Sequence, residues 1–192
     1  MGRWLGAVVL LLGSQLLVGR PAGAAPVQWT KASGGNGHTY DAVYVAAGLD
    51  WVQAQLAVAG RGCGWYLATI TSAAENRFVF RLVANKPELF VENLNGPWLG
   101  GYQASSRSEP KGDWRWVTGE AFRYTSWASG QPNDYVAGDS TLEPGIPTGQ
   151  QEGFLHFIGR AGRWNDLNVN SQPRGYVAEF DPGRHKACRA EG

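Results

Sequence analysis

Two short stretches carry most of the structural information in this 192-residue chain: WASGQPND at residues 127–134 and WND at residues 164–166. Each has a tryptophan followed by side chains that bear oxygen atoms, and Glu152 lies between the two stretches. Hard cations such as Ca²⁺ bind about six to eight oxygens from carboxylates, amides and the backbone. The sequence therefore predicts a calcium site if the fold brings the stretches together, and ordinary turns if it does not. The oxygen-bearing side chains are Gln131, Asn133, Asp134, Asn165 and Asp166.

Residues 1–25 are predicted to be a cleaved signal peptide. Arg3 precedes an apolar segment over residues 4–18, and AGA at residues 22–24 matches the small-residue cleavage pattern. The apolar segment is shorter than the roughly 20 residues of a membrane-spanning helix, which disfavours an uncleaved anchor. We therefore expect a protein that is secreted to a periplasm or the extracellular space, with no membrane insertion after cleavage.

The charge of the mature chain excludes one class of partner. Cleavage removes Arg3 and Arg20 and no acidic residue, so the formal charge changes from +1 to −1. Lys and Arg are not clustered along the sequence, so we expect no nucleic-acid partner. The remaining length of about 167 residues suffices for one domain with its own core. Glycine accounts for 27 of the 192 residues, about twice the usual share of 7%, so we expect many turns and loops.

Two helices are predicted in the first half of the chain. Asp50 can cap a helix over residues 51–59, which Gly60 ends. SAAE at residues 72–75 is a capping box, and apolar residues then recur at helical spacing until Pro87 stops the helix.

Short β-prone segments surround these helices and are separated by long Gly- and Pro-rich connections. Residues 131–151 show little regular structure, which is typical of functional loops. Helices followed by strands and long loops indicate an α+β domain, with two helices, small antiparallel sheets and a long ligand-binding loop region. The first and last strands can pair and bring the ends of the domain together. The predicted strands are 39–47, 66–70, 98–101, 114–117, 154–157 and 175–180.

The mature chain is divided into three parts. We expect a flexible N-terminal segment over residues 26–37, a domain over residues 38–181 and a C-terminal tail over residues 182–192. Only two cysteines are present, Cys63 and Cys188. In an exported protein such an isolated pair most often forms one disulfide.

The order of motifs along residues 38–181 resembles the C-type lectin-like domain. Each motif alone is weak, but their common order and spacing are specific. The resemblance implies a secreted, single-domain lectin of bacterial type, which binds a glycan or polysaccharide with Ca²⁺ as cofactor. Trp98, Trp116 and Trp164 are then expected in the core. The matching motifs are LATI (67–70), EN (75–76), WLG (98–100), WVTG (116–119), Trp127 before QPN (131–133), and WND (164–166).

The resemblance also implies a calcium site. In the family, a cis proline between two oxygen-bearing residues turns both side chains toward the ion. Two vicinal sugar hydroxyls complete the coordination and hydrogen-bond to the same side chains. The implied metal ligands are Gln131, Asn133, Glu152, Asn165 and Asp166. The implied sugar-binding residues are Gln131, Asn133, Glu152, Asn165 and Tyr135, the last as a ring that stacks on the sugar or, alternatively, a plain loop residue.

The chain departs from the family pattern at several places. Its Gln-Pro-Asn motif is a hybrid of the mannose-type Glu-Pro-Asn and the galactose-type Gln-Pro-Asp, so both sugar classes stay open. Asp134 matches a residue of an auxiliary calcium site, but the other positions fall near Gln103 and Arg107, which are poor ligands, so we expect that site to be absent. Phe154 and Ala178 stand where the family has cysteines, and the two cysteines of this chain would restore one family bridge in shifted form.

Two alternatives belong to other functional classes. Glu152 and Asp166 could form a glycosidase-like pair, but the sequence has no nucleophile elbow or metalloprotease motif, so we expect no enzyme. A calcium-independent extracellular interaction domain on the same scaffold is the second alternative. Single lectin sites gain strength by multivalency, so a homo-oligomer would be useful, although no coiled-coil segment indicates one.

Overall fold

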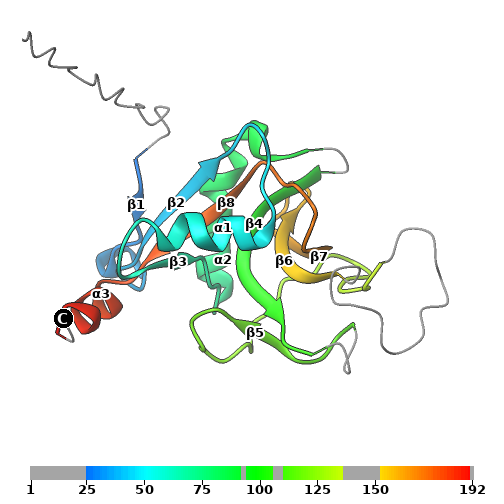
Figure 1. Cartoon of the computed structure of the whole chain (residues 1–192). Helices are drawn as coiled ribbons and strands as arrows, with labels where there is room; N and C mark the ends of the chain where they lie inside the picture. The colour runs from blue at the N-terminus through cyan, green and yellow to red at the C-terminus, as the bar shows by residue number, and fades with distance from the viewer. Residues whose placement is uncertain (1–24, 92–93, 106–109, 136–151, 191–192) are drawn as a thin grey trace, which may run out of the picture.

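The computed structural model describes residues 25–91, 94–105, 110–135 and 152–190 (Figure 1). In these ranges an eight-stranded sheet has the order β1-β2-β8-β4-β6-β7, with β3 also beside β8 and β5 beside β4. Its strand pairs are antiparallel except β4 with β8. The strands are β1 (Val27–Gln28), β2 (Thr39–Tyr44), β3 (Trp65–Leu67), β4 (Asn95–Gln103), β5 (Trp114–Trp116), β6 (Glu152–Ile158), β7 (Arg163–Asn168) and β8 (Gly175–Phe180).

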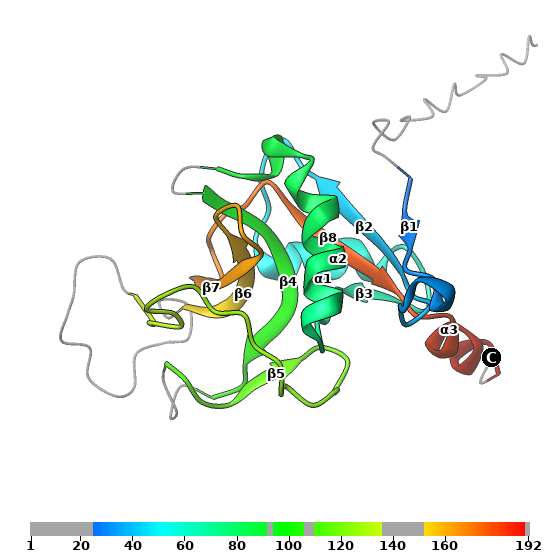
Figure 2. The ribbon, with the colours of Figure 1, turned by 180° about the vertical axis from the view of Figure 1, so that it is seen from behind.

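The helices are α1 (Trp51–Ala59), α2 (Ala73–Ala84) and α3 (Pro182–Ala190), with two short 3₁₀ helices, η1 (Lys31–Ser33) and η2 (Pro87–Leu89). Figures 1 and 2, which are views from opposite sides, show α1 and α2 on opposite faces of the sheet. None of the helices in the described ranges combines the length and the hydropathy needed to span a bilayer. Residues 1–24 of the predicted signal peptide lie outside those ranges.

Local capping explains where the first two helices begin, as the sequence predicts. The carboxylate of Asp50 accepts from the Gln53 backbone N–H at 2.7 Å, and the Gln53 side chain accepts from the Asp50 N–H at 3.0 Å. At the start of α2, the hydroxyl of Ser72 accepts from the Glu75 N–H at 3.2 Å. Each bond satisfies a backbone donor that has no partner within the helix.

The third helix corrects the prediction of two helices and a C-terminal tail. Residues 182–190 form α3 instead. Its first turn has Pro182, whose fixed φ suits that position, and the carboxylate of Asp181 accepts from the Gly183 N–H at 2.7 Å. A disulfide between Cys188 of α3 and Cys63 also holds the helix against the rest of the domain.

The sheet also differs from the predicted small antiparallel sheets, because one parallel contact between β4 and β8 joins the strands into a mixed sheet. The segment over residues 26–37, predicted to be flexible, contains β1 and η1. Its Trp29 ring stacks on Phe78 of α2 with centroids 5.4 Å apart. Strand pairing and burial of this aromatic surface hold the segment against the domain.

The two faces of the sheet form two hydrophobic clusters, one under each helix. The α2 side includes Val79, Val83 and Trp164, and the α1 side includes Trp51 and Trp98. The predicted core positions of Trp98, Trp116 and Trp164 are confirmed, because these side chains are at most 1% exposed. The ring of Trp164 packs edge-on against Trp116 at 5.8 Å, which fixes the start of the WND stretch in the core.

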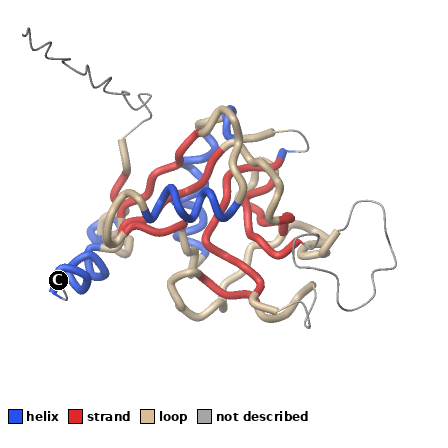
Figure 3. The backbone as a smooth tube through the Cα atoms, viewed as in Figure 1, coloured by secondary structure: helices blue, strands red, loops and turns tan. Residues whose placement is uncertain are grey.

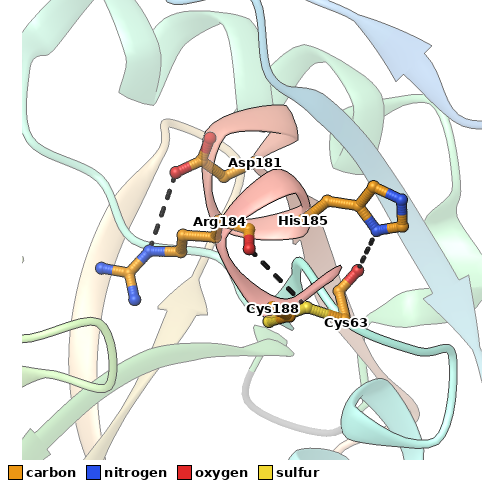
Figure 4. Close-up of a disulfide and its surroundings, with 5 residues drawn as sticks. All are labelled: Cys63, Asp181, Arg184, His185 and Cys188. Carbon is orange, nitrogen blue, oxygen red and sulfur yellow. Dashed lines mark hydrogen bonds and ion pairs between the residues drawn. A yellow bond between two sulfur atoms is a disulfide. The ribbon is translucent and has the colours of Figure 1, made fainter. Parts of the chain in front are cut away.

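The ends of the domain meet as predicted. β2 pairs with β8 over six residues, from Thr39 opposite Phe180 to Tyr44 opposite Gly175. The predicted disulfide between Cys63 and Cys188 is present and joins the connection after α1 to α3 (Figure 4). His185 of α3 lies beside it, with its Nδ1 2.9 Å from the Cys63 carbonyl oxygen. The chain after β5, up to Tyr135, runs mostly as loop (Figure 3).

Candidate functional site

The loop that follows β5 is held against the start of β7 by backbone contacts. The Ala128 N–H donates to the Trp164 carbonyl at 2.8 Å, and Trp127 forms a bridge with Trp164. The Gln131 N–H then closes a turn onto Ala128 at 3.0 Å. The Gln131–Pro132 peptide bond is cis, as the resemblance implies. The two motif stretches of the sequence therefore meet in space.

Asp166 lies at the centre of this meeting point. Its carboxylate accepts from the backbone N–H of Asn133 at 3.0 and 3.2 Å and from that of Asp134 at 2.9 Å. The side chain is fully buried. Next to it, the Asn165 side-chain N–H donates to the Asp166 carbonyl at 2.6 Å. β7 thus presents both residues toward the loop that carries the cis proline.

Glu152, at the first position of β6, is connected to the same loop. Its Oε2 accepts from the Tyr135 N–H at 2.8 Å, and its own N–H donates to Asp134 Oδ1 at 2.9 Å. Glu152 is 8% exposed, whereas the Tyr135 ring is 63% exposed. β6 and β7 are antiparallel neighbours, with Leu155 opposite Asp166. The sheet therefore brings Glu152 to the loop although residues 136–151, which lie outside the described ranges, separate them in sequence.

Three carboxylates crowd this region. Burial raises the pKa of Glu152 to about 8, opposed by the Tyr135 N–H and reinforced by the nearby charges of Asp166 and Asp134. Burial also raises the pKa of Asp166 and of Asp134 above their ordinary values. Within the described ranges no Lys or Arg forms an ion pair with any of the three. A bound cation would offset the cost of burying these charges.

Two amide oxygens complete the set of candidate ligands. Gln131 Oε1 and Asn165 Oδ1 are buried and have no hydrogen-bond partner among the described atoms. Unpaired buried acceptors are rare in proteins. Together with the carboxylates of Glu152 and Asp166 they are hard oxygen donors, the chemistry that Ca²⁺ requires. The residues present therefore fit a calcium ion, although no group of three or more His, Cys, Asp or Glu side chains suited to a metal occurs in the described part of the chain.

Asn133 and the residues matched to the auxiliary calcium site are placed differently from the four candidate ligands above. Asn133 reaches the site through its backbone, and its side chain is exposed. Asp134 accepts a hydrogen bond from the Glu152 N–H, a positioning role that the sequence analysis missed. Its proximity to Pro132 was the only available signal. Gln103 donates to the Gly112 carbonyl at 2.8 Å, and Arg107 lies outside the described residues, so the expected absence of an auxiliary site stays a prediction.

Asn76 of α2 belongs to the EN motif, but the sequence analysis assigned it no role at the site. Its Oδ1 accepts from the Trp164 indole N–H at 2.9 Å, and its Nδ2 donates to the Gly162 carbonyl at 2.8 Å. Asn76 thereby fixes Trp164, the residue immediately before the two site residues on β7.

Comparisons with known proteins agree with this fold. No family model matches the chain. The chain is 31% identical over 119 residues to the C-type lectin lectoxin-Lio1 of Erythrolamprus poecilogyrus, covering 62% of this chain and 60% of that protein. It is 30% identical over 120 residues to the lectin BRA-3 of Megabalanus rosa, covering 62% and 59%. The chain thus spans about three fifths of these curated relatives, which are animal proteins and give no support to the expected bacterial type.

Solved structures show the same architecture. The C-type lectin CEL-I from Cucumaria echinata matches with a TM-score of 0.56 and 22% identity, over 75% of this chain and 90% of that one. The C-type carbohydrate-recognition domain of cow CD23 matches with a TM-score of 0.54 and 20% identity, over 83% and 95%. The chain has the C-type lectin-like fold.

Proposed function

We propose that this chain is a carbohydrate-binding lectin that acts outside the cell and uses a calcium ion to hold vicinal sugar hydroxyls. The ion would be held by Gln131, Asn133, Glu152, Asn165 and Asp166. A bound Ca²⁺ supplies positive charge and open coordination positions for hydroxyl oxygens. The sequence relatives named as lectins and the lectin fold support a binding function over catalysis.

One observation carries the proposal: two unpaired amide oxygens lie in the same small region as two buried carboxylates. Gln131 Oε1 and Asn165 Oδ1 have no partner among the described atoms. Glu152 and Asp166 keep raised pKa values because their charge is buried. Buried groups of this kind are costly without partners, and a divalent cation bound by all four would offset that cost.

Other contacts within the chain would position the loop and the sugar. Asp166 and Glu152 hold the loop in place through the N–H groups of Asn133, Asp134 and Tyr135. The exposed Tyr135 ring stands at the edge of this site. An aromatic ring there can stack on the apolar face of a sugar, which favours galactose-type ligands. The Gln-Pro-Asn motif does not select one sugar class, so mannose-type ligands are tested as well.

A glycan array probed in calcium and in chelator tests this function. Wild type should bind glycans in calcium only, and Asp166→Ala should bind none, because it loses a buried carboxylate of the site. Glu88→Ala is the control, since Glu88 is an exposed carboxylate on η2, outside the proposed site. Equal glycan binding in chelator, or unimpaired Asp166→Ala, contradicts the calcium mechanism. Tyr135→Ala should weaken sugar binding while the affinity for Ca²⁺ is unchanged.

A calcium-independent interaction domain is the second candidate. The observation in its favour is that Asp166 and Glu152 accept backbone hydrogen bonds from the loop, contacts that hold the loop by themselves. Binding of no glycan at all in calcium, together with a melting temperature that is the same in calcium and in chelator, would select it.

A further inference from the structure

A cavity lies between α2 and the turn that joins β6 to β7. It opens to solvent and has a volume of about 250 Å³. It is lined by Asn76, Arg77, Phe80, Arg81, Ala161 and Gly162. None of these belongs to the proposed calcium site.

The walls of this cavity are held in place by buried hydrogen bonds. The Gly162 carbonyl accepts from Asn76 Nδ2 at 2.8 Å and from the Ser126 hydroxyl at 3.0 Å. Gly162 has a φ of 64°, and a Cβ there would lie 3.1 Å from the Phe80 ring and 3.3 Å from the Asn76 amide. A side chain at residue 162 would therefore be strained and would fill the cavity. Glycine at this position keeps it open.

The charge around the cavity is of one sign. Arg77 and Arg81 are one turn apart on α2, and Arg160 and Arg163 flank the β6–β7 turn. All four are exposed, and in the described ranges none forms an ion pair. No carboxylate lines the cavity. The acid on α2, Glu75, is buried and accepts from the hydroxyl of Tyr40 instead. Arg77 and Arg81 thus put positive charge at the cavity wall, and Arg160 and Arg163 add exposed positive charge on the adjoining turn.

This chemistry fits one kind of ligand. The planar guanidinium groups of Arg77 and Arg81 match the oxygens of a sulfate or carboxylate, and Phe80 offers an apolar face to a sugar ring. The volume is below the roughly 300–1,000 Å³ of pockets for larger ligands, so it suits one charged unit of a longer chain. We propose that this cavity binds the sulfate or carboxylate group of an acidic polysaccharide, and does so without calcium.

The cavity and the proposed calcium site are both connected to β7. Gly162 of the cavity wall directly precedes β7, and Asp166 of the calcium site lies four residues further along the chain. A polysaccharide that contacted both sites would gain effective affinity from the second contact. That the ligand is a glycan rests on the proposed function; that it is an anion rests on the arginines.

Retention on immobilised dextran sulfate, with neutral dextran as reference and with chelator present, tests the proposal. Wild type should be retained on dextran sulfate only. Arg77→Gln/Arg81→Gln should weaken binding by about tenfold or more, because charge-assisted hydrogen bonds are lost. Arg115→Gln/Arg174→Gln removes the same charge elsewhere on the surface and should have an effect of less than about threefold.

A second variant leaves every arginine in place. Ala161→Asp puts a carboxylate at the exposed turn that lines the cavity with Arg77 and Arg81, and should also weaken retention. Absence of wild-type retention overturns the proposal, as does an equal loss in both arginine pairs, which would mean diffuse charge attraction. Binding to phosphatidylserine vesicles without binding to dextran sulfate overturns the glycan assignment. Because these measurements are made in chelator, their failure is distinct from failure of the calcium-dependent array.

Discussion

Replacing both cysteines by serine in Cys63→Ser/Cys188→Ser tests how the disulfide stabilises the fold. The bridge spans a sequence separation of 125. In the chain-entropy treatment, closing a loop of that length lowers the entropy of the unfolded state and raises its free energy by about 5 kcal/mol at 25 °C. In the native state the bridge also holds α3, whose other contacts to the body include those of His185 and Arg184 with the Cys63 and Thr118 carbonyls. Because the freed helix regains some entropy, the expected loss is smaller, about 3–5 kcal/mol.

The measurement is urea unfolding of the mature protein and the double variant, followed by tryptophan fluorescence. The midpoint should fall, the slope should rise because the unfolded chain without the bridge is less compact, and the melting temperature should fall by about 10 °C. A variant that combines Cys63→Ser with truncation after Asp181 separates the two contributions: equal stability to the double variant means that α3 acts through the bridge. A loss below about 1 kcal/mol in the double variant would refute the loop-closure reasoning.

Three further predictions follow from buried contacts. The hydrogen bond that His38 donates to Glu179 raises the pKa of His38 above 6.5. The stabilisation is therefore complete below pH 6.5 and is lost as the pH rises through the folded-state pKa, so the stability advantage of wild type over His38→Gln, measured by urea unfolding, should shrink as the pH rises above 6.5. Asn76→Leu leaves the Trp164 indole N–H and the Gly162 carbonyl without this partner and should cost about 2–4 kcal/mol in chemical denaturation, whereas the exposed Asn85→Leu should cost little. Gly100→Ala places a Cβ 2.3 Å from the Leu67 carbonyl oxygen and should cost about 3 kcal/mol or more, seen as a lower melting temperature; an unchanged value would mean that β3 and β4 separate easily.

Sequence analysis correctly predicted the elements that depend on residues close together in the chain. The caps at Asp50 and Ser72 determine where α1 and α2 begin, and both side chains bond as their positions in the sequence indicate. The cysteine pair needed only the count of two and an oxidising compartment. By contrast, β7 contains asparagine and aspartate, which are poor strand formers, and was interpreted only as a source of ligands. Pairing with β6 and burial of Trp164 make it a strand.

The candidate site also has features that the sequence predicted and features that it did not. The identity of the oxygen donors and their grouping around Pro132 and Trp164 follow from the sequence and its resemblance. The sequence could not show that Asp166 and Glu152 hold the loop through backbone N–H groups, nor that Asp134 binds Glu152. Those bonds depend on the register of β6 with β7, and register is set by which faces of the strands are buried.

The arginines beside α2 are the clearest case of information that belongs to the tertiary structure alone. Arg77 and Arg81 are about 80 residues from Arg160 and Arg163, so the sequence contains no basic cluster and predicts none. Composition, caps, cysteine count and motif order determined the elements and the lectin-like fold, because helix starts and strand patterns depend on near neighbours. Only the packing of α2 against the β6–β7 turn, through Asn76 and Gly162, brings the turn that carries Arg160 and Arg163 beside the helix that carries Arg77 and Arg81. Electrostatic interaction depends on distance in space and not on separation along the chain.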